Sequence, residues 1–153
     1  MSGGLIRISE HLYRFRDSCN AYLLTDGEAG LVIDPGSGEI LDHLDQAGVT
    51  QVEWALHTHH HRDQCWGTAR LREHGAKVAV PEYEKHLFDQ AELFWQTRRT
   101  FDNYNDRNTF FATGENIPVD AALEDYETFT WRGYEFFVLP AKGHTLGSSA
   151  LIA

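Results

Sequence analysis

The sequence predicts a layered α/β sandwich with mixed sheets. Three observations favour this class: short apolar runs recur along the chain, helical patterns separate those in the middle, and hairpin-like pairs stand near both ends. The chain has 153 residues, 42% of them hydrophobic, which is enough for one core. We therefore expect a single domain over residues 1–153.

The N-terminal part combines strands with one helix. We expect a first strand over residues 5–17. The segment NAYLLTD at 20–26 and the β-branched run GLVIDPG at 30–36 are typical of further strands, with glycines turning the chain between them. Residues 38–47 show apolar side chains at helical spacing and precede Gly48, which indicates a helix that ends there.

The middle of the chain alternates strands and helices. The segment VEWALHTH at 52–59 predicts a strand that runs into a histidine cluster. Asp63 can then cap a helix that continues to His74. A strand at 76–81 and a longer helix at 82–99 complete the alternation.

The C-terminal part returns to strands. Residues 100–118 show no regular pattern, whereas 126–140 indicate a hairpin that turns at Arg132 and Gly133. The apolar run SSALIA at 148–153 begins another strand. Because we find no partner for that strand in the sequence, we expect the chain to be a fragment or a truncated domain.

Charge and composition exclude several classes of protein. A net charge of −10 with scattered basic residues disfavours nucleic acid as a partner. No apolar run is long enough to span a membrane, and the first residues do not form a secretory signal. Cys19 and Cys65 lack CxxC spacing and are expected to be free thiols. We expect a cytoplasmic protein.

The stretch HTHHHRDQCWG concentrates metal-binding side chains. It places four histidines and one aspartate within seven residues. Along a strand, His59 and His61 would project to one side, His57 would lie buried one step deeper, and His60 would face away and be exposed. Paired imidazoles suit Zn²⁺, and Asp63 adds a carboxylate at the mouth of the same loop.

A catalytic zinc ion usually has a third protein ligand. His144, between Gly143 and Thr145 after a predicted strand, offers one. The alternative is that the histidines are solvated and that Asp63 only caps a helix. That alternative suits a lone histidine better than a His-x-His-x-Asp pattern behind a buried strand.

The motifs resemble those of the metallo-β-lactamase superfamily. THHHRDQ is similar to its signature T-H-x-H-x-D-H, and GHTLGS is similar to its later G-H-T-x-G-S. NAYLLTD and GLVIDPGSG also resemble the opening strands of that family. The similarity runs over essentially the whole chain in the right order, and it implies the N-terminal portion of a layered αββα fold.

The resemblance implies roles for individual residues. His59, His61 and His144 would ligate the first metal, and Asp63 would belong to the second. Asp34, which closes its strand, would hold the loop, although a purely structural turn role fits it nearly as well. Gln64 stands where the family usually has a histidine, and an amide is a poorer ligand for zinc.

The second metal site should therefore be weak or empty, leaving one zinc ion. The family normally continues beyond Ala153 to a bridging aspartate and a final histidine. We expect a metal-dependent hydrolase in the full-length protein and do not expect this chain to turn over substrate alone. In that hydrolase a metal-bound hydroxide would attack an ester, thioester, lactone or amide carbonyl of a small-molecule substrate.

Asp63 would act as the catalytic base or orient the nucleophile, and Gln64 could hydrogen-bond substrate or water. Two alternatives remain open. One is a non-catalytic binding module of the same fold with a degraded second metal site. The other is a di-iron relative, which usually has more carboxylates beside the His-x-His motif than this chain offers.

Two features indicate self-association. The strand at the C-terminus would expose an edge, which favours oligomers or aggregation. The aromatic-rich segment 88–111 could form a subunit contact, a lid over the metal, or core packing through its helical spacing. Cys65, beside Gln64, is expected to be packed rather than to bind metal.

Overall fold

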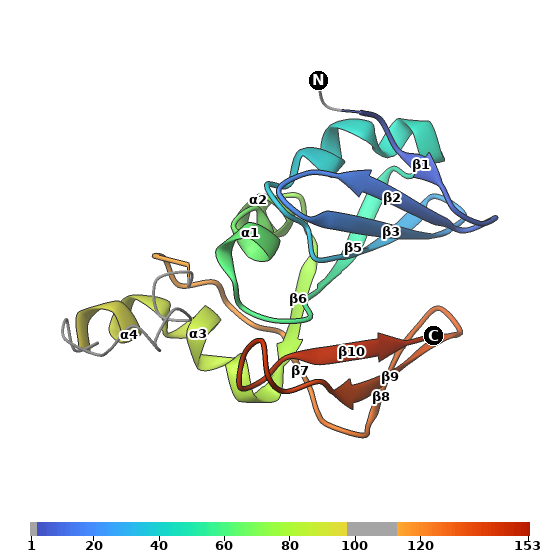
Figure 1. Cartoon of the computed structure of the whole chain (residues 1–153). Coiled ribbons are helices and arrows are strands. Elements are labelled where there is room, and N and C mark those ends of the chain that lie inside the picture. The colour runs from blue at the N-terminus through green and yellow to red at the C-terminus, as the bar shows by residue number, and fades with distance from the viewer. Residues whose placement is uncertain (1–2, 98–112) are drawn as a thin grey trace. The chain divides into compact units, whose positions relative to one another are not determined.

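The structure is a computed structural model that describes residues 3–97 and 113–153 (Figure 1). The chain divides into two compact units. The first contains Met1–His57 and Asp63–Ala79, and the second contains Thr58–Arg62 and Val80–Ala153. The single domain expected from the sequence stays a prediction, and each unit is described by itself.

The first unit is built on a mixed sheet whose strands follow chain order. The first four strands pair antiparallel, and the next two add in parallel. The segment expected as one strand at 5–17 is instead two strands joined by a turn. In order, the strands are β1 (Ile6–Arg7), β2 (Leu12–Arg16), β3 (Asn20–Asp26), β4 (Ala29–Ile33), β5 (Gln51–Leu56) and β6 (Lys77–Pro81).

Helical segments of this unit are shorter or tighter than the sequence predicts. The expected helix at 38–47 is the 3₁₀ helix η1 (Glu39–Ala47), which ends at Gly48 with a left-handed backbone, φ 68°. The single helix expected from Asp63 to His74 is wrong. Two short helices, α1 (Arg62–Cys65) and α2 (Thr68–Glu73), stand in its place.

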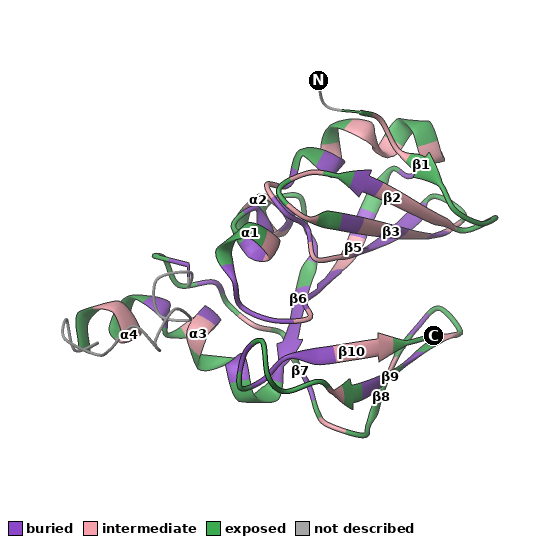
Figure 2. Ribbon diagram, in the orientation of Figure 1, coloured by how far each residue is buried: buried purple, intermediate pink, exposed green. Residues whose placement is uncertain are grey.

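The core of the first unit lies between its sheet and these helices. Buried residues of the sheet are coloured purple on the ribbon in Figure 2. Each fully buried aliphatic or aromatic side chain contributes about 1.5–3 kcal/mol by leaving water. The cluster contains Phe15, Ala21, Leu23, Val32, Ile40, Val49, Val52, Ala55, Leu71 and Ala76.

The second unit begins with short helical segments after β6. The long helix expected at 82–99 is wrong, because Gln90 leaves the helical region at φ −123° and interrupts it. Of the expected irregular span 100–118, residues 113–118 have no regular structure, and the others lie outside the described residues. The elements are η2 (Glu82–Glu84), α3 (His86–Asp89), α4 (Ala91–Thr97) and β7 (Ala121–Leu123).

A three-stranded antiparallel sheet completes the second unit. Its strands β8 (Thr128–Trp131) and β9 (Tyr134–Pro140) form the expected hairpin, and Arg132 and Gly133 turn it with positive φ values of 47° and 85°. β10 (Ser149–Ile152) pairs with β9. The expectation that this last strand has no partner in the sequence is therefore wrong.

The mixed α/β class expected from the sequence is what the structure shows. None of the helices in the described part of the chain combines the length and hydrophobicity needed to cross a bilayer.

Candidate metal centre

The histidine cluster lies beyond a strand and not on it. β5 ends at Leu56, and the residues from His57 to His61 are irregular until α1 begins. The expectation of a strand over 52–59 is wrong at this end. Within the second unit the segment is held instead by the backbone N–H of Ser149, which donates to the carbonyl of Thr58 over 2.9 Å.

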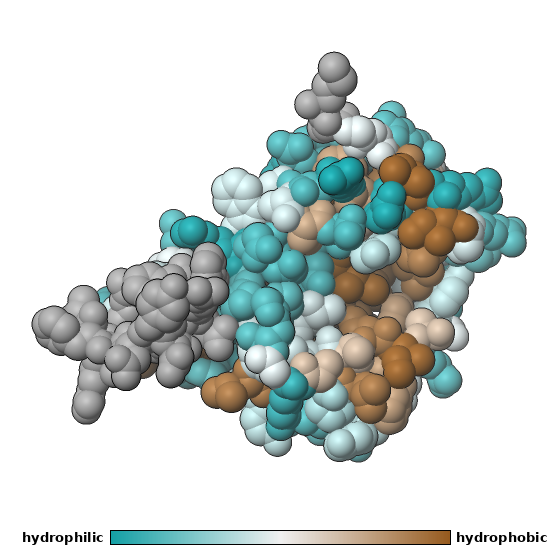
Figure 3. All heavy atoms as spheres, in the orientation of Figure 1, coloured by the Kyte–Doolittle hydropathy of each residue, from teal (hydrophilic) through white to brown (hydrophobic). Residues whose placement is uncertain are grey.

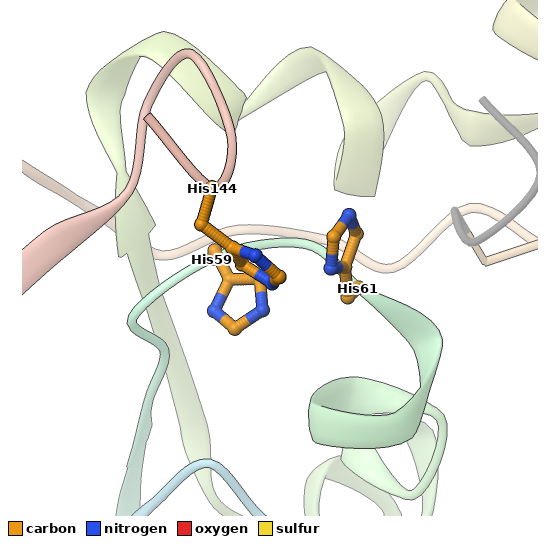
Figure 4. Close-up of side chains that lie close together, drawn as sticks. All are labelled: His59, His61 and His144. Atoms are coloured by element: carbon orange, nitrogen blue, oxygen red, sulfur yellow. The ribbon is translucent and has the colours of Figure 1, made fainter. Parts of the chain in front are cut away.

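Three imidazole rings converge within the second unit. His59 and His61 come from the segment after β5, and His144 comes from the loop between β9 and β10 (Figure 4). The ring centroids of the three pairs lie 4.5 to 4.9 Å apart. One ring nitrogen from each residue lies within 4.8 Å of the other two.

His59 is set up as a neutral donor. Its Nδ1 lies 2.9 Å from the hydroxyl of Thr58. Its Nε2 is buried and has no hydrogen-bond partner among the described residues. Burial, followed by the charges of His61 and His144, lowers the pKa of His59 from 6.5 to about 4. The ring is therefore neutral at pH 7, with a nitrogen facing the other two rings.

These donors fit a zinc ion. Zinc takes three neutral imidazoles in catalytic sites and bonds their nitrogens at about 2.0 Å. The ring nitrogens lie within 4.8 Å of one another, so the rings would move closer together around an ion. A buried nitrogen without a partner costs free energy until a ligand satisfies it, and His59 Nε2 is such an atom. His144 is exposed, so the centre is open to solvent on its side.

His60 differs from its expectation. It was expected to face away and be exposed, and its side chain is instead almost fully buried. Its Nδ1 lies 3.1 Å from Oε2 of Glu84, which is also buried. Burial alone raises the pKa of Glu84, but hydrogen bonds from His60 and Thr145 and the charge of His60 outweigh it and lower the pKa.

Glu84 is a residue that sequence reasoning missed. It sits at the end of η2 behind Pro81, with exposed neighbours on either side, and nothing in its local pattern marks it. A buried carboxylate needs polar partners because burying it unpaired is costly, and the partners of Glu84 are known only from the structure.

His57 has a structural role in the first unit, as its expected burial implies. It is fully buried, and its Nδ1–H donates to the carbonyl of Ala79 over 3.0 Å. Its Nε2 then accepts from the hydroxyl of Thr68 at 2.7 Å. The ring joins the end of β5 to β6 and α2.

Three other predicted site residues lie in the first unit. Asp34 follows β4 with a left-handed backbone, φ 51°, and its N–H donates to Leu56. Asp63 is exposed on α1, and Gln64 is half-buried with its Oε1 lacking a partner among the described residues. Their roles as a second-metal ligand, a base or loop supports stay predictions.

The two cysteines of the first unit are shielded thiols. Cys65 is fully buried, which agrees with the expected packing role. Burial, with the charges of Asp34, Asp17 and Asp63, raises the pKa of the Cys19 thiol to about 12. Neither thiol belongs to the histidine group that could hold a metal.

The fold and the three grouped histidines are those of an α/β protein that could hold a metal ion, and comparison with known proteins gives the family. The model of the metallo-β-lactamase superfamily matches residues 14–152. The chain belongs to that superfamily.

Solved structures share its fold at low sequence identity. A β-lactamase from Chitinophaga pinensis has a TM-score of 0.77 at 20% identity, covering 98% of this chain and 56% of that one. A subclass B3 metallo-β-lactamase of Bradyrhizobium japonicum has a TM-score of 0.76 at 19% identity, covering 97% and 55%. The chain thus spans little more than half the length of these enzymes.

A curated relative is closer in sequence over a shorter stretch. A hydroxyacylglutathione hydrolase of Maricaulis maris is 39% identical over 77 residues, which cover 41% of this chain and 29% of that protein. A further structure of the same fold, from Cronobacter sakazakii, is a metallo-β-lactamase described by its HARLDQ motif, with a TM-score of 0.72 at 19% identity over 96% of this chain and 58% of that one.

Proposed function

We propose that this chain carries the metal centre of a zinc-dependent hydrolase that cleaves an ester, thioester, lactone or amide of a small molecule. The observation that supports this most is the convergence of His59, His61 and His144 in a member of the metallo-β-lactamase superfamily. The partnerless buried Nε2 of His59 supports the same conclusion.

The residues of the chain would hold and present the ion. A zinc ion bound there would lower the pKa of a coordinated water towards about 7 and polarise a carbonyl oxygen. Three neutral imidazoles leave the charge of the ion undiminished, which favours both effects. The exposed side of His144 is where a substrate would approach, because His59 and His61 are buried.

Asp63 is proposed as the base or orienting group. It follows His61 by two residues in the sequence and its side chain is exposed, and a carboxylate of this kind can take a proton from a nucleophile. Asp34 and Gln64 are proposed to support the loop and to bind substrate or water.

The glutamine at position 64 affects how many metal ions we expect and whether a non-catalytic binding module should be considered. An amide at this position should leave the second site weak or empty, and we propose one zinc ion per chain. The Cronobacter metallo-β-lactamase described by its HARLDQ motif also ends that motif in Asp-Gln. A glutamine here therefore gives no specific support to a binding module that has lost catalysis.

The zinc content of the 153-residue chain tests the site. We expect about one zinc per chain after desalting, measured by elemental mass spectrometry, and less than about one tenth of that for His61→Ala, because two histidines do not make a stable centre. His11→Ala, a change at a half-exposed histidine of the first unit, is the matched control and should retain zinc.

Unchanged zinc content in His61→Ala would contradict the assignment. Iron with a visible absorption band in place of zinc would favour the di-iron alternative. Hydrolysis is then tested on a panel of acyl thioesters, esters, lactones and β-lactams with zinc-loaded and chelator-treated protein. Acyl thioesters of glutathione come first, since the curated relative is named for hydroxyacylglutathione.

A further inference from the structure

A buried carboxylate joins the two chain segments that carry the histidines. Glu84 is 1% exposed, and both of its oxygens face polar partners of the second unit. Burying a carboxylate costs several kcal/mol unless each oxygen is satisfied. Glu84 is buried although it is not one of the three candidate metal ligands.

One oxygen of Glu84 contacts the segment of the first two histidines. Its Oε2 lies 3.1 Å from Nδ1 of His60, the residue between His59 and His61. The side chain of His60 is 3% exposed, so solvent does not compete for this contact. Fixing His60 restrains the backbone on which both neighbouring histidines stand.

The other oxygen contacts the loop of the third histidine. Oε1 accepts hydrogen bonds from the hydroxyl of Thr145 and, over 3.3 Å, from the backbone N–H of Gly147. The loop is closed on itself as well, because the N–H of Thr145 donates to Oγ of Ser148 over 3.0 Å. His144 directly precedes this fixed turn.

Gly147 makes the approach of Glu84 sterically feasible. A Cβ atom at this position would lie 2.4 Å from Cγ of Glu84, well inside van der Waals contact. Only glycine at position 147 lets the carboxylate reach the loop. The end of the GHTLGS motif and the distant Glu84 therefore pack together.

We propose that Glu84 is a positioning residue that sets the spacing between His144 and the His59–His61 pair. This inference rests on the proposed zinc centre. Glu84 would act through His60 on one side and through Thr145 and Gly147 on the other, without touching the ion. Groups behind metal ligands fix ligand geometry in advance and typically change metal affinity by about tenfold to a hundredfold when removed.

Zinc affinity of the whole chain, measured by competition with a chromophoric chelator, tests the proposal. Glu84→Ala should raise the Kd for zinc about tenfold to a hundredfold. Glu84→Gln keeps an amide oxygen that can still accept from Thr145 and Gly147, so it should weaken zinc binding less than Glu84→Ala does. Glu82→Ala, on the exposed side of the same 3₁₀ turn, is the matched control and should change nothing.

A second pair of variants tests the contact of Glu84 with the loop by changing a glycine of the loop instead of Glu84 itself. Gly147→Ala displaces Glu84 and should weaken zinc binding as Glu84→Ala does. Gly114→Ala adds a methyl group that meets none of the described residues and should not weaken it. The visible spectrum of the cobalt-substituted protein reports ligand geometry, and it should shift in Glu84→Ala and Gly147→Ala only. Circular dichroism checks that each variant is folded.

The outcomes separate the two levels of inference. If the wild-type chain binds no zinc, or His61→Ala binds it equally well, the proposed function fails. If wild type binds zinc and His61→Ala does not, but Glu84→Ala and Gly147→Ala keep wild-type affinity and cobalt spectrum, Glu84 does not position the ligands. Should those variants not fold, Thr145→Val decides: unchanged zinc affinity overturns the proposal, and a loss of about threefold or more supports it.

Discussion

At the scale of single residues, His59 links the metal centre to acid stability. Burial and two neighbouring histidines lower its pKa to about 4, whereas the unfolded chain has the ordinary value of 6.5. The unfolded state therefore binds more protons than the folded state between these two pH values. The corresponding stability is present above pH 6.5 and is lost as the pH falls through 4.

We expect protonation linked to His59 to lower the free energy of unfolding of the metal-free protein by about 3 kcal/mol when the pH falls from 6.5 to 4. Urea unfolding at a series of pH values in the presence of a chelator measures it. His59→Asn, which cannot be protonated, should lose that much less than wild type over the same range. Parallel curves for the two proteins would contradict the depressed pKa.

The residue scale also shows what a sequence can predict of a site. The histidines were predicted from their spacing because metal ligands must be of particular types. The exposure of His60 was predicted wrongly because its buried partner, Glu84, lies far along the chain. Glu84 was missed because its partners lie far along the chain.

At the scale of elements, the break between α1 and α2 depends on a close contact inside the first unit. Gly67 packs directly against the backbone of Ser37, and its N–H donates to the carbonyl of Gly36 over 2.8 Å. The N–H of Gly36 in turn donates to the carbonyl of Gln64 over 2.9 Å. These bonds fix the turn after β4 against the start of the helical segment.

Gly67→Ala should destabilise the protein by about 1–3 kcal/mol, because the new Cβ would lie 2.2 Å from a backbone carbon of Ser37 that cannot rotate away. Urea unfolding measures the change. Gly114→Ala, where a Cβ meets nothing within 4 Å among the described residues, is the control. Equal stability of the two variants would show that the turn gives way at little cost.

Elements differ in how far the sequence determines them. The hairpin of β8 and β9 was predicted because Arg132 and Gly133 encode its turn locally. The helices expected at 63–74 and 82–99 were wrong because their interruptions arise from packing and backbone geometry away from the local pattern. Apolar spacing identifies a helical segment more reliably than it fixes where the helix breaks.

At the scale of the whole molecule, the sheet of the second unit presents an apolar face. Phe137 and Leu139 on β9 and Ile152 on β10 are exposed, and the register places Phe137 opposite Ile152. Figure 3 shows hydrophobic side chains on the surface over these strands. Among the described residues, β10 is an edge strand of its sheet. Self-association, which was expected from the sequence, remains a prediction, and this apolar face is the surface through which it would occur.

We expect the chain to self-associate through this face at micromolar concentration, since large exposed apolar patches favour association. Leu139→Lys should weaken the association at least about tenfold in sedimentation velocity, equivalent to about 1.4 kcal/mol. Thr130→Lys adds the same charge at an exposed polar position of β8 and should weaken it less. A wild-type protein that is monomeric throughout would contradict the expectation. Whether the aromatic segment 88–111 contributes depends largely on residues outside the described ranges.

The five residues Thr58–Arg62 belong to the second unit although the chain on both sides of them belongs to the first. No uninterrupted piece of the gene therefore encodes the second unit. A recombinant fragment that starts at Val80 would retain Glu84 and His144 but lack both other histidines. Zinc capture can consequently serve as an assay for the assembly of distant chain segments during refolding, because a polypeptide truncated between them has no complete centre to load.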